Sequence, residues 1–425
     1  MTDVLFARVV AELVHRSHLV AGEDLSSMLD EVLRPLGLRA EILLVDLGQQ
    51  TLTSAAPRPA TEQVGLVAVE GTLAGRAFQH GETVAGLGDG RMLWVPILDG
   101  TERVGVLRLA LDPDVRVDAV LRVRAETVAG LVGHIVMSKL VYSDHLRRLR
   151  AHTGLAVASE LLWHLVPPRT VATADVALAA LLEPHDRVAG DAYDYAVDHD
   201  NVYLGVFDGV GHDLHAGVTT SLAVNIIRNA RRQGVSDLTV LADTADDHLI
   251  RHGGPSRFVT AALVRLDTTT GVVDYLVAGH PPPLLLRNGR MIRPLDAPLR
   301  PPLGVVPSAV PSPALRSPAA HEQLEPGDRL LIYTDGIVEA RDDRGEFFGE
   351  QRQIDLVERT EQSRLSAPEA LRRLAAAILA HQNGRLQDVA TLLMLDWTPT
   401  STPGVPPGHR LRSATDQAAD RDLGC

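Results

Sequence analysis

The sequence predicts an α+β protein with two domains, and three observations support this prediction. Its 425 residues exceed what one hydrophobic core usually organises. Strand-like runs alternate with amphipathic helical stretches in both halves of the chain. A long helical stretch that ends at Pro167-Pro168 separates the halves. We therefore expect a domain over residues 1–114, linker helices over 115–170, a second domain over 171–397 and a disordered tail over 398–425.

The composition limits the compartment and the kinds of partner. Hydrophobic residues make up 45% of the chain and charged residues 22%, which is typical of a globular protein. No apolar run approaches the roughly 20 residues of a membrane span. The formal net charge of −13 argues against nucleic acid as a partner. The single cysteine, Cys425, excludes internal disulfides. We expect a cytoplasmic protein that binds neither membranes nor nucleic acids.

A β-hairpin is predicted in the first domain and a long helical stretch after it. The hairpin pairs residues 93–98 with 104–111 across the turn signal Asp99-Gly100. From Val115 to Leu165, apolar residues recur at steps of three to five, which is a helical spacing. Because an apolar stripe of this length usually packs against a partner helix, we expect a homodimer.

The second domain is predicted to be rich in sheet. Five apolar runs have the length and composition of strands, at 202–207, 258–266, 272–279, 329–333 and 389–395. Helices are expected over 214–230, where apolar residues step by four, and from Pro368 onwards. The proline-rich stretch 294–318 is expected to form an irregular surface loop.

Four acidic residues lie at the ends of these strand-like runs. Asp208 and Asp335 follow a run, Asp388 precedes one, and Asp191 stands ahead of a Tyr-Asp-Tyr cluster. Each alone is most simply a solvated turn carboxylate. Together they favour a divalent cation, because a carboxylate beside a buried strand needs a positive partner and no Lys or Arg directly flanks three of them. Ligation by oxygen alone favours Mg²⁺ or Mn²⁺ over zinc.

An ordered set of motifs around these acids resembles a known family. The motifs are GDAYDY (190–195), FDGVGHD (207–213), RFVTAALVRLD (257–267), AGHPPPLLL (278–286), LEPGDRLLIYTDGIVEARDDRGEFFG (324–349) and DVATLLML (388–395). The set resembles the bacterial type 2C-like (PPM) serine/threonine phosphatases of the stage II sporulation protein E group. The resemblance covers nearly all of residues 171–397.

The resemblance implies a fold and a metal centre. The fold is an αββα sandwich of two antiparallel sheets with two Mn²⁺ or Mg²⁺ ions at one end. Asp191 and Asp208 would bind both ions and the Gly209 carbonyl would complete one site, while Asp335 and Asp388 would hold the second ion. The four aspartates would then be catalytic through a metal-activated water, with no covalent intermediate.

Two histidines and one further aspartate in these motifs have open roles. His212 and His280 are either proton donors or structural residues in Gly-His turns. Asp213 stands where the family usually has a glycine. It either strengthens ion binding or caps the helix that begins there.

The first domain carries a weaker resemblance, to the end of a GAF sensor domain. The stretches GTLAGRAFQHGETV (71–84) and LWVPILDGTERVGVLRLALD (93–112) carry it. It implies an α/β sensor for an unknown small-molecule signal. Residues 158–168 resemble the switch segment that precedes the phosphatase domain in relatives, although a passive tether is the alternative.

Two functions follow from these resemblances. The first is a metal-dependent phosphoserine/phosphothreonine protein phosphatase regulated by the sensor, whose expected substrate is a phosphorylated anti-anti-sigma factor. The second is a catalytically weak regulatory binding module that keeps the phosphatase fold. Retention of all four aspartates favours the first.

Overall fold

The computed structural model describes two compact units that divide between residues 154 and 155. It describes residues 3–56, 65–86, 91–151, 155–183, 190–211, 213–252, 257–306, 317–362, 365–383 and 389–399. In the described part of the chain, no helix is both long enough and apolar enough to cross a membrane.

The N-terminal unit is built on a six-stranded antiparallel sheet in the order β3-β2-β1-β6-β5-β4. Its strands are β1 (Leu38–Val45), β2 (Thr51–Ser54), β3 (Leu66–Ala68), β4 (Val84–Ala85), β5 (Met92–Asp99) and β6 (Glu102–Leu111). The predicted hairpin is confirmed, because β5 and β6 pair across Gly100, which has a φ of 59°. A GAF-like sensor remains a prediction for this unit.

Helices cover both faces of this sheet. They are α1 (Asp3–Ser17), α2 (Leu25–Leu33), the 3₁₀ helix η1 (Arg34–Leu36), α3 (Leu73–His80), α4 (Ala119–Leu140) and α5 (Asp144–Arg150). Apolar residues of α1, α2, α4 and α5 share one core with the sheet, while α3 packs Phe78 into a separate, smaller core.

The helical stretch predicted after residue 115 is divided into α4, α5 and α6 (Val157–Leu165). Helix α4 buries Leu121, Val128, Val132 and Val136 in the core of its own unit, packed on β5 and β6. Much of this helical stretch is therefore covered within the same chain, although Val120 and Val123 of α4 are 54% and 53% exposed. A homodimer remains a prediction.

The C-terminal unit contains two antiparallel sheets. One has five strands in the order β15-β12-β11-β10-β9 and the other has six in the order β14-β13-β16-β17-β8-β7. The strands are β7 (Thr170–Ala172), β8 (Val176–Glu183), β9 (Asp191–Val197), β10 (Asn201–Gly209), β11 (Val259–Asp267), β12 (Val272–Ala278), β13 (Leu284–Arg287), β14 (Arg290–Pro294), β15 (Ala320–Gln323), β16 (Arg329–Tyr333) and β17 (Ala390–Trp397). All five predicted strands are among them.

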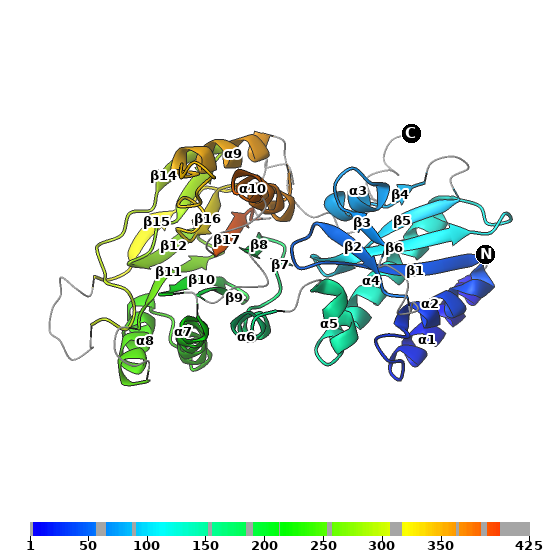
Figure 1. Ribbon diagram of the computed structural model, residues 1–425, viewed down its shortest axis with the longest axis horizontal. Coiled ribbons are helices and arrows are strands. Elements are labelled where there is room, and N and C mark those ends of the chain that lie inside the picture. Colours follow the sequence, from blue (N-terminus) through cyan, green and yellow to red (C-terminus); the bar gives the residue numbers. More distant parts are fainter. Residues whose placement is uncertain are drawn as a thin grey trace. The chain divides into compact units, whose positions relative to one another are not determined.

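The two sheets pack face to face with helices outside them, which confirms the predicted αββα sandwich (Figure 1). The helices are α6, α7 (Leu214–Arg232), α8 (Leu238–His252), α9 (Glu350–Gln362) and α10 (Ala367–His381). One core joins α6, α7 and α8 to the five-stranded sheet and continues between the sheets. A second core joins α9 and α10 to the outer face of the six-stranded sheet.

The proline-rich stretch carries one buried arginine. Residues 295–306 are irregular, as expected, yet the Arg300 side chain is only 1% exposed. One of its terminal nitrogens lies 2.7 Å from a carboxylate oxygen of Asp243 and 2.7 Å from one of Asp246, both on α8. The described part of this stretch is therefore an irregular surface loop, with Leu299 81% exposed, which the buried Arg300 holds against α8.

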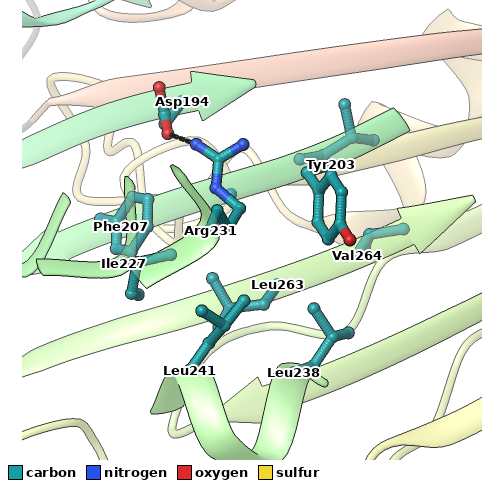
Figure 2. Close-up of a pocket in the computed structure, with 11 residues that line it drawn as sticks. Asp194, Tyr203, Phe207, Ile227, Arg231, Leu238, Leu241, Leu263 and Val264 are labelled. Carbon is teal, nitrogen blue, oxygen red and sulfur yellow. Dashed lines mark hydrogen bonds and ion pairs between the residues drawn. The ribbon is translucent and has the colours of Figure 1, made fainter. Parts of the chain in front are cut away.

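Strand β9 carries a buried carboxylate, Asp194, on the face toward α7. The Asp194 side chain is 5% exposed and forms ion pairs with Arg228, at 2.6 Å, and with Arg231. Figure 2 shows Arg231 reaching Asp194 above apolar side chains of β10, β11, α7 and α8, including Phe207. The cavity there is about 10 Å³, room for about one water. The cluster therefore holds helix α7 to the sheet and leaves no room for a ligand.

The end of α6 and the two prolines after it accept hydrogen bonds, through their backbone carbonyls, from side chains of β9 and α7. Arg228 donates to the carbonyl of Leu165 at 3.0 Å as well as to Asp194. The hydroxyls of Tyr193 and Tyr195 donate to the carbonyls of Pro167 and Pro168, at 2.9 and 2.7 Å. The Tyr-Asp-Tyr cluster thus anchors the end of α6 to the edge strand β9.

Asp194→Asn should destabilise the C-terminal unit by about 3 kcal/mol, because it leaves two largely buried arginines without their anion. Urea unfolding followed by tryptophan fluorescence measures this change. Asp200→Asn is the matched control, since the Asp200 side chain is 55% exposed and its loss should cost less than about 0.5 kcal/mol. Equal unfolding midpoints for the two variants would contradict the proposed role of Asp194.

Candidate metal centre

Two of the four predicted acidic residues meet at one edge of the five-stranded sheet. Asp191 begins β9, and Asp208 is directly opposite it near the end of β10. Because paired residues of antiparallel strands point to the same face, both side chains face the six-stranded sheet. That sheet supplies Thr334, which directly follows β16, and Thr391 on β17.

The Asp191 carboxylate is buried between the sheets. Asp191 is 3% exposed, and its Oδ2 accepts hydrogen bonds from the hydroxyls of Thr334, at 2.7 Å, and Thr391, at 2.9 Å. Burial, together with the neighbouring charge of Asp208, raises the pKa of Asp191 well above its ordinary value, against the opposing effect of the two hydroxyls.

The contrast with Asp194 on the same strand indicates a cation site. Asp194 is buried on one face of β9 and faces two arginines. Asp191 is buried on the other face, where its described partners are two hydroxyls and another carboxylate. A buried carboxylate that faces a second, half-buried carboxylate, with no basic side chain among its own described partners, is the electrostatic environment that a bound divalent cation stabilises.

Oxygen atoms also converge beside Gly190. A Cβ atom on Gly190 would stand 2.6 Å from the Gly209 carbonyl oxygen, 3.0 Å from that of Gly211 and 3.6 Å from Oδ1 of Asp208. Only glycine leaves this space open. Because the surrounding donors are all oxygens, the residues present fit Mg²⁺ or Mn²⁺. Gly209 is itself constrained, because its own Cβ would lie 2.2 Å from the Thr220 hydroxyl oxygen.

The other predicted ligands lie near the same edge or outside the described residues. Asp335 is exposed and directly follows Thr334, the residue that contacts Asp191. A Cβ on Gly336 would stand 1.9 Å from the Val389 carbonyl oxygen, so the chain beside Asp335 runs against the start of β17. Asp388 and His212 lie outside the described residues. Within the described ranges, no three acidic or histidine side chains form one metal-binding group. The four-aspartate ligand set remains a prediction.

Two open roles can be addressed from the structure. Asp213 is the N-cap of α7, since its Oδ1 accepts from the Ala216 amide at 2.9 Å. His280 is 6% exposed, its Nδ1 lies 2.8 Å from the Thr260 hydroxyl, and burial lowers its pKa to about 3. A neutral, buried imidazole favours a structural role over that of a cationic proton donor.

The sequence analysis did not identify Thr334 and Thr391 as part of the site. Both lie inside the quoted motifs, directly before Asp335 and three residues after Asp388. The sequence signal for each is a threonine close to an aspartate at the end of an apolar run. Its role becomes clear only from the hydrogen bond to Asp191, which lies far away in the sequence on the other sheet.

Comparison with known families agrees with this geometry. Residues 198–398 match the family model described as Stage II sporulation protein E (SpoIIE). The match lies within the C-terminal unit and covers less than half of the chain. Over these residues the chain resembles type 2C-like serine/threonine phosphatases.

Two curated proteins resemble the chain over part of its length. Protein IcfG of Synechocystis sp. (strain ATCC 27184 / PCC 6803 / Kazusa) is 26% identical over 235 residues, covering 49% of this chain and 36% of that protein. Phosphoserine phosphatase RsbP of Bacillus subtilis (strain 168) is 26% identical over 157 residues, covering 36% of this chain and 37% of that protein. The chain therefore spans little more than a third of either relative.

Solved structures show a more distant similarity. The RsbU and RsbW domains of Rv1364c from Mycobacterium tuberculosis are 26% identical, with a TM-score of 0.45 over 55% of this chain and 64% of that one. The SiaA-PP2C domain of Pseudomonas aeruginosa is 21% identical, with a TM-score of 0.44 over 52% and 85%.

Asp191→Asn should remove a pH-dependent loss of stability from the metal-free protein. A carboxyl group whose pKa is raised by folding destabilises the fold as pH rises from its unfolded pKa, about 4, through the raised value. In EDTA, the melting temperature of the wild type should therefore fall relative to that of Asp191→Asn as pH rises through this window. The difference should vanish below about pH 4.

Thermal melts of both proteins across this pH range measure the effect. Asp200→Asn, at an exposed turn, serves as the control and should follow the wild type at every pH. Parallel curves for the wild type and Asp191→Asn would show that Asp191 has no raised pKa in the folded protein.

Proposed function

We propose that the C-terminal domain is a metal-dependent phosphoserine/phosphothreonine protein phosphatase. One observation carries this proposal: the buried Asp191 carboxylate faces Asp208 beside an oxygen-lined space at Gly190, in a domain that matches the stage II sporulation protein E family model. A carboxylate pair of this kind suits hard cations, which can activate a water for direct attack on the phosphate.

The proposed centre holds two Mn²⁺ or Mg²⁺ ions. Asp191, Asp208 and the Gly209 carbonyl would bind ions at the end of β9 and β10, while Asp335 and Asp388 would complete the second site. When bound, the ions would supply Lewis acidity and an activated water. The protein would contribute fixed carboxylates, because β9 and β10 are paired in register through Asp191 and Asp208.

The proposed substrate is a phosphorylated protein. One relative bears the name phosphoserine phosphatase, which supports phosphoserine chemistry here. By analogy with the family, we propose an anti-anti-sigma factor as the substrate protein. A cytoplasmic location would follow from such a substrate.

The second candidate is a regulatory binding module with weak catalysis. Asp213, which stands where the family usually has a glycine, is one departure from the family pattern. Asp213 caps helix α7 and leaves Asp191 and Asp208 in register, so the structure gives the second candidate no specific support. An activity assay separates the two.

Regulation is proposed to pass through α6. This helix packs on α7 through Leu162, which is fully buried, and its end is held by Arg228, Tyr193 and Tyr195. Because Tyr193 lies two residues from Asp191, a shift of α6 would act on the strand that carries the proposed ligand. A small-molecule signal at the N-terminal unit would then bias the position of α6.

Hydrolysis of para-nitrophenyl phosphate should require Mn²⁺ or Mg²⁺, because the candidate ligands are carboxylate and carbonyl oxygens. EDTA should abolish turnover and excess Mn²⁺ should restore it. Asp208→Asn and Asp335→Asn should each lower the rate by about a hundredfold or more, since each removes ligand charge.

Steady-state kinetics on metal-stripped protein measure these rates, and Asp200→Asn should keep the wild-type rate. Full activity of metal-stripped protein in EDTA would exclude the two-metal mechanism. A wild type that binds Mn²⁺ but hydrolyses neither this ester nor a phosphoserine peptide would favour the binding module.

Leu162→Ala should change the turnover number at saturating Mn²⁺, because it removes the buried contact of α6 with the core around α7. Leu161→Ala is the matched control, since Leu161 is 38% exposed on the same helix. Near-ultraviolet circular dichroism should show that both variants remain folded. A passive tether would give identical turnover numbers for the wild type and both variants.

A further inference from the structure

We propose that Thr334 and Thr391 are positioning residues that together fix the Asp191 carboxylate for cation binding. Their hydroxyls occupy Oδ2 and leave Oδ1 as the oxygen that a cation can reach. This inference rests on the proposed function and adds to it two residues without charge, which would set cation affinity rather than take part in the chemistry.

The two threonines form one cross-strand unit. The Thr391 amide donates to the Thr334 hydroxyl oxygen at 2.9 Å, and the Thr334 amide donates to the Thr391 carbonyl at 3.1 Å. Both residues have no exposed surface. Because Thr334 directly follows β16 and Thr391 lies on the neighbouring strand β17, the pairing of these strands sets their geometry.

Counting protons fixes the direction of the hydrogen bonds to Asp191. A threonine hydroxyl has one proton and can accept through its lone pairs. The Thr334 oxygen already accepts from the Thr391 amide, so its single proton is available for Asp191 Oδ2. The Thr391 hydroxyl has Asp191 Oδ2 as its described partner and donates to it in the same way.

Two donated protons saturate one oxygen of the carboxylate. A carboxylate oxygen offers about two lone-pair directions, so Oδ2 has none left for a cation or a water. The remaining oxygen, Oδ1, belongs to the same carboxyl group that interacts with Asp208. The threonine pair therefore selects both the rotamer of Asp191 and the oxygen it presents.

The two threonines differ in how cleanly they can be tested. Replacing Thr334 would also remove the acceptor of the buried Thr391 amide, which would destabilise the fold for an unrelated reason. Thr391→Val keeps the side-chain shape and removes only the hydroxyl that donates to Asp191. Thr391→Ser restores that hydroxyl. Thr360→Val removes another buried hydroxyl of the same unit, which bonds to the Val357 carbonyl within α9.

Isothermal titration of the full-length, metal-stripped protein with MnCl₂ gives the decisive measurement. Thr391→Val should weaken Mn²⁺ binding about 10- to 100-fold, the usual effect of losing a hydrogen bond to a metal ligand. Thr391→Ser should bind within about threefold of the wild type, and Thr360→Val should match it. With para-nitrophenyl phosphate, the Mn²⁺ concentration for half-maximal activity should rise in Thr391→Val, while the rate at saturating Mn²⁺ changes much less.

Several results would overturn the inference. If the wild type binds Mn²⁺ and Thr391→Val binds it equally well, the hydroxyl does not position the ligand, while the proposed phosphatase function stands. Weakening by Thr391→Ser as severe as that by Thr391→Val would assign the effect to packing instead. If the wild type itself binds no Mn²⁺, the proposed function fails and the positioning role fails with it.

Discussion

The buried carboxylate of Asp191 is the constraint on which this end of the sandwich depends. Elsewhere the sheets meet through apolar side chains such as Leu393 and Val206. At Asp191 they meet through hydrogen bonds, because a carboxylate on β9 accepts from hydroxyls of the other sheet. Burying an ionised group is unfavourable unless its oxygens are satisfied. The same contacts that place the candidate ligand therefore also fix the spacing of the sheets.

The alternation of a β-strand separates two tasks on β9. Residues 191, 193 and 195 point to one face, and 194 points to the other. One face presents the candidate metal site and the tyrosine that anchors the end of α6, while the other carries the ion pairs with α7. The seven residues of β9 thus carry a candidate metal ligand, hold helix α7 and bind the end of α6 with the segment that follows it. A shift of one residue in register would exchange the two faces.

Much of the fold could be predicted from the sequence, because it is recorded in local periodicity. The apolar runs that became β10, β11, β12, β16 and β17 are visible without a structure, as is the four-residue step along α7. Strand β9 could not be recognised as a strand, because its Asp, Tyr and Ala residues lack an apolar alternation. The division of the linker into three helices also escaped prediction, since its apolar stripe continues across the breaks.

The candidate site could be predicted only in part. The aspartates at strand ends were recognisable because charge beside an apolar run is unusual, and the structure brings Asp191 and Asp208 together. Thr334 and Thr391 were not recognisable. A threonine in or beside a strand is ordinary by itself. Thr334 and Thr391 lie 143 and 200 residues from Asp191 in the sequence, so their hydrogen bonds to it can be seen only in the folded protein.

The anchoring of the segment after α6 has a consequence for how such chains evolve. Arg228, Tyr193 and Tyr195 donate hydrogen bonds to the main-chain carbonyls of residues 165, 167 and 168. Every amino acid offers a carbonyl, proline included. Substitutions at Pro167 and Pro168 therefore leave the acceptors of these hydrogen bonds in place, and this attachment constrains Tyr193, Tyr195 and Arg228 more than the two prolines.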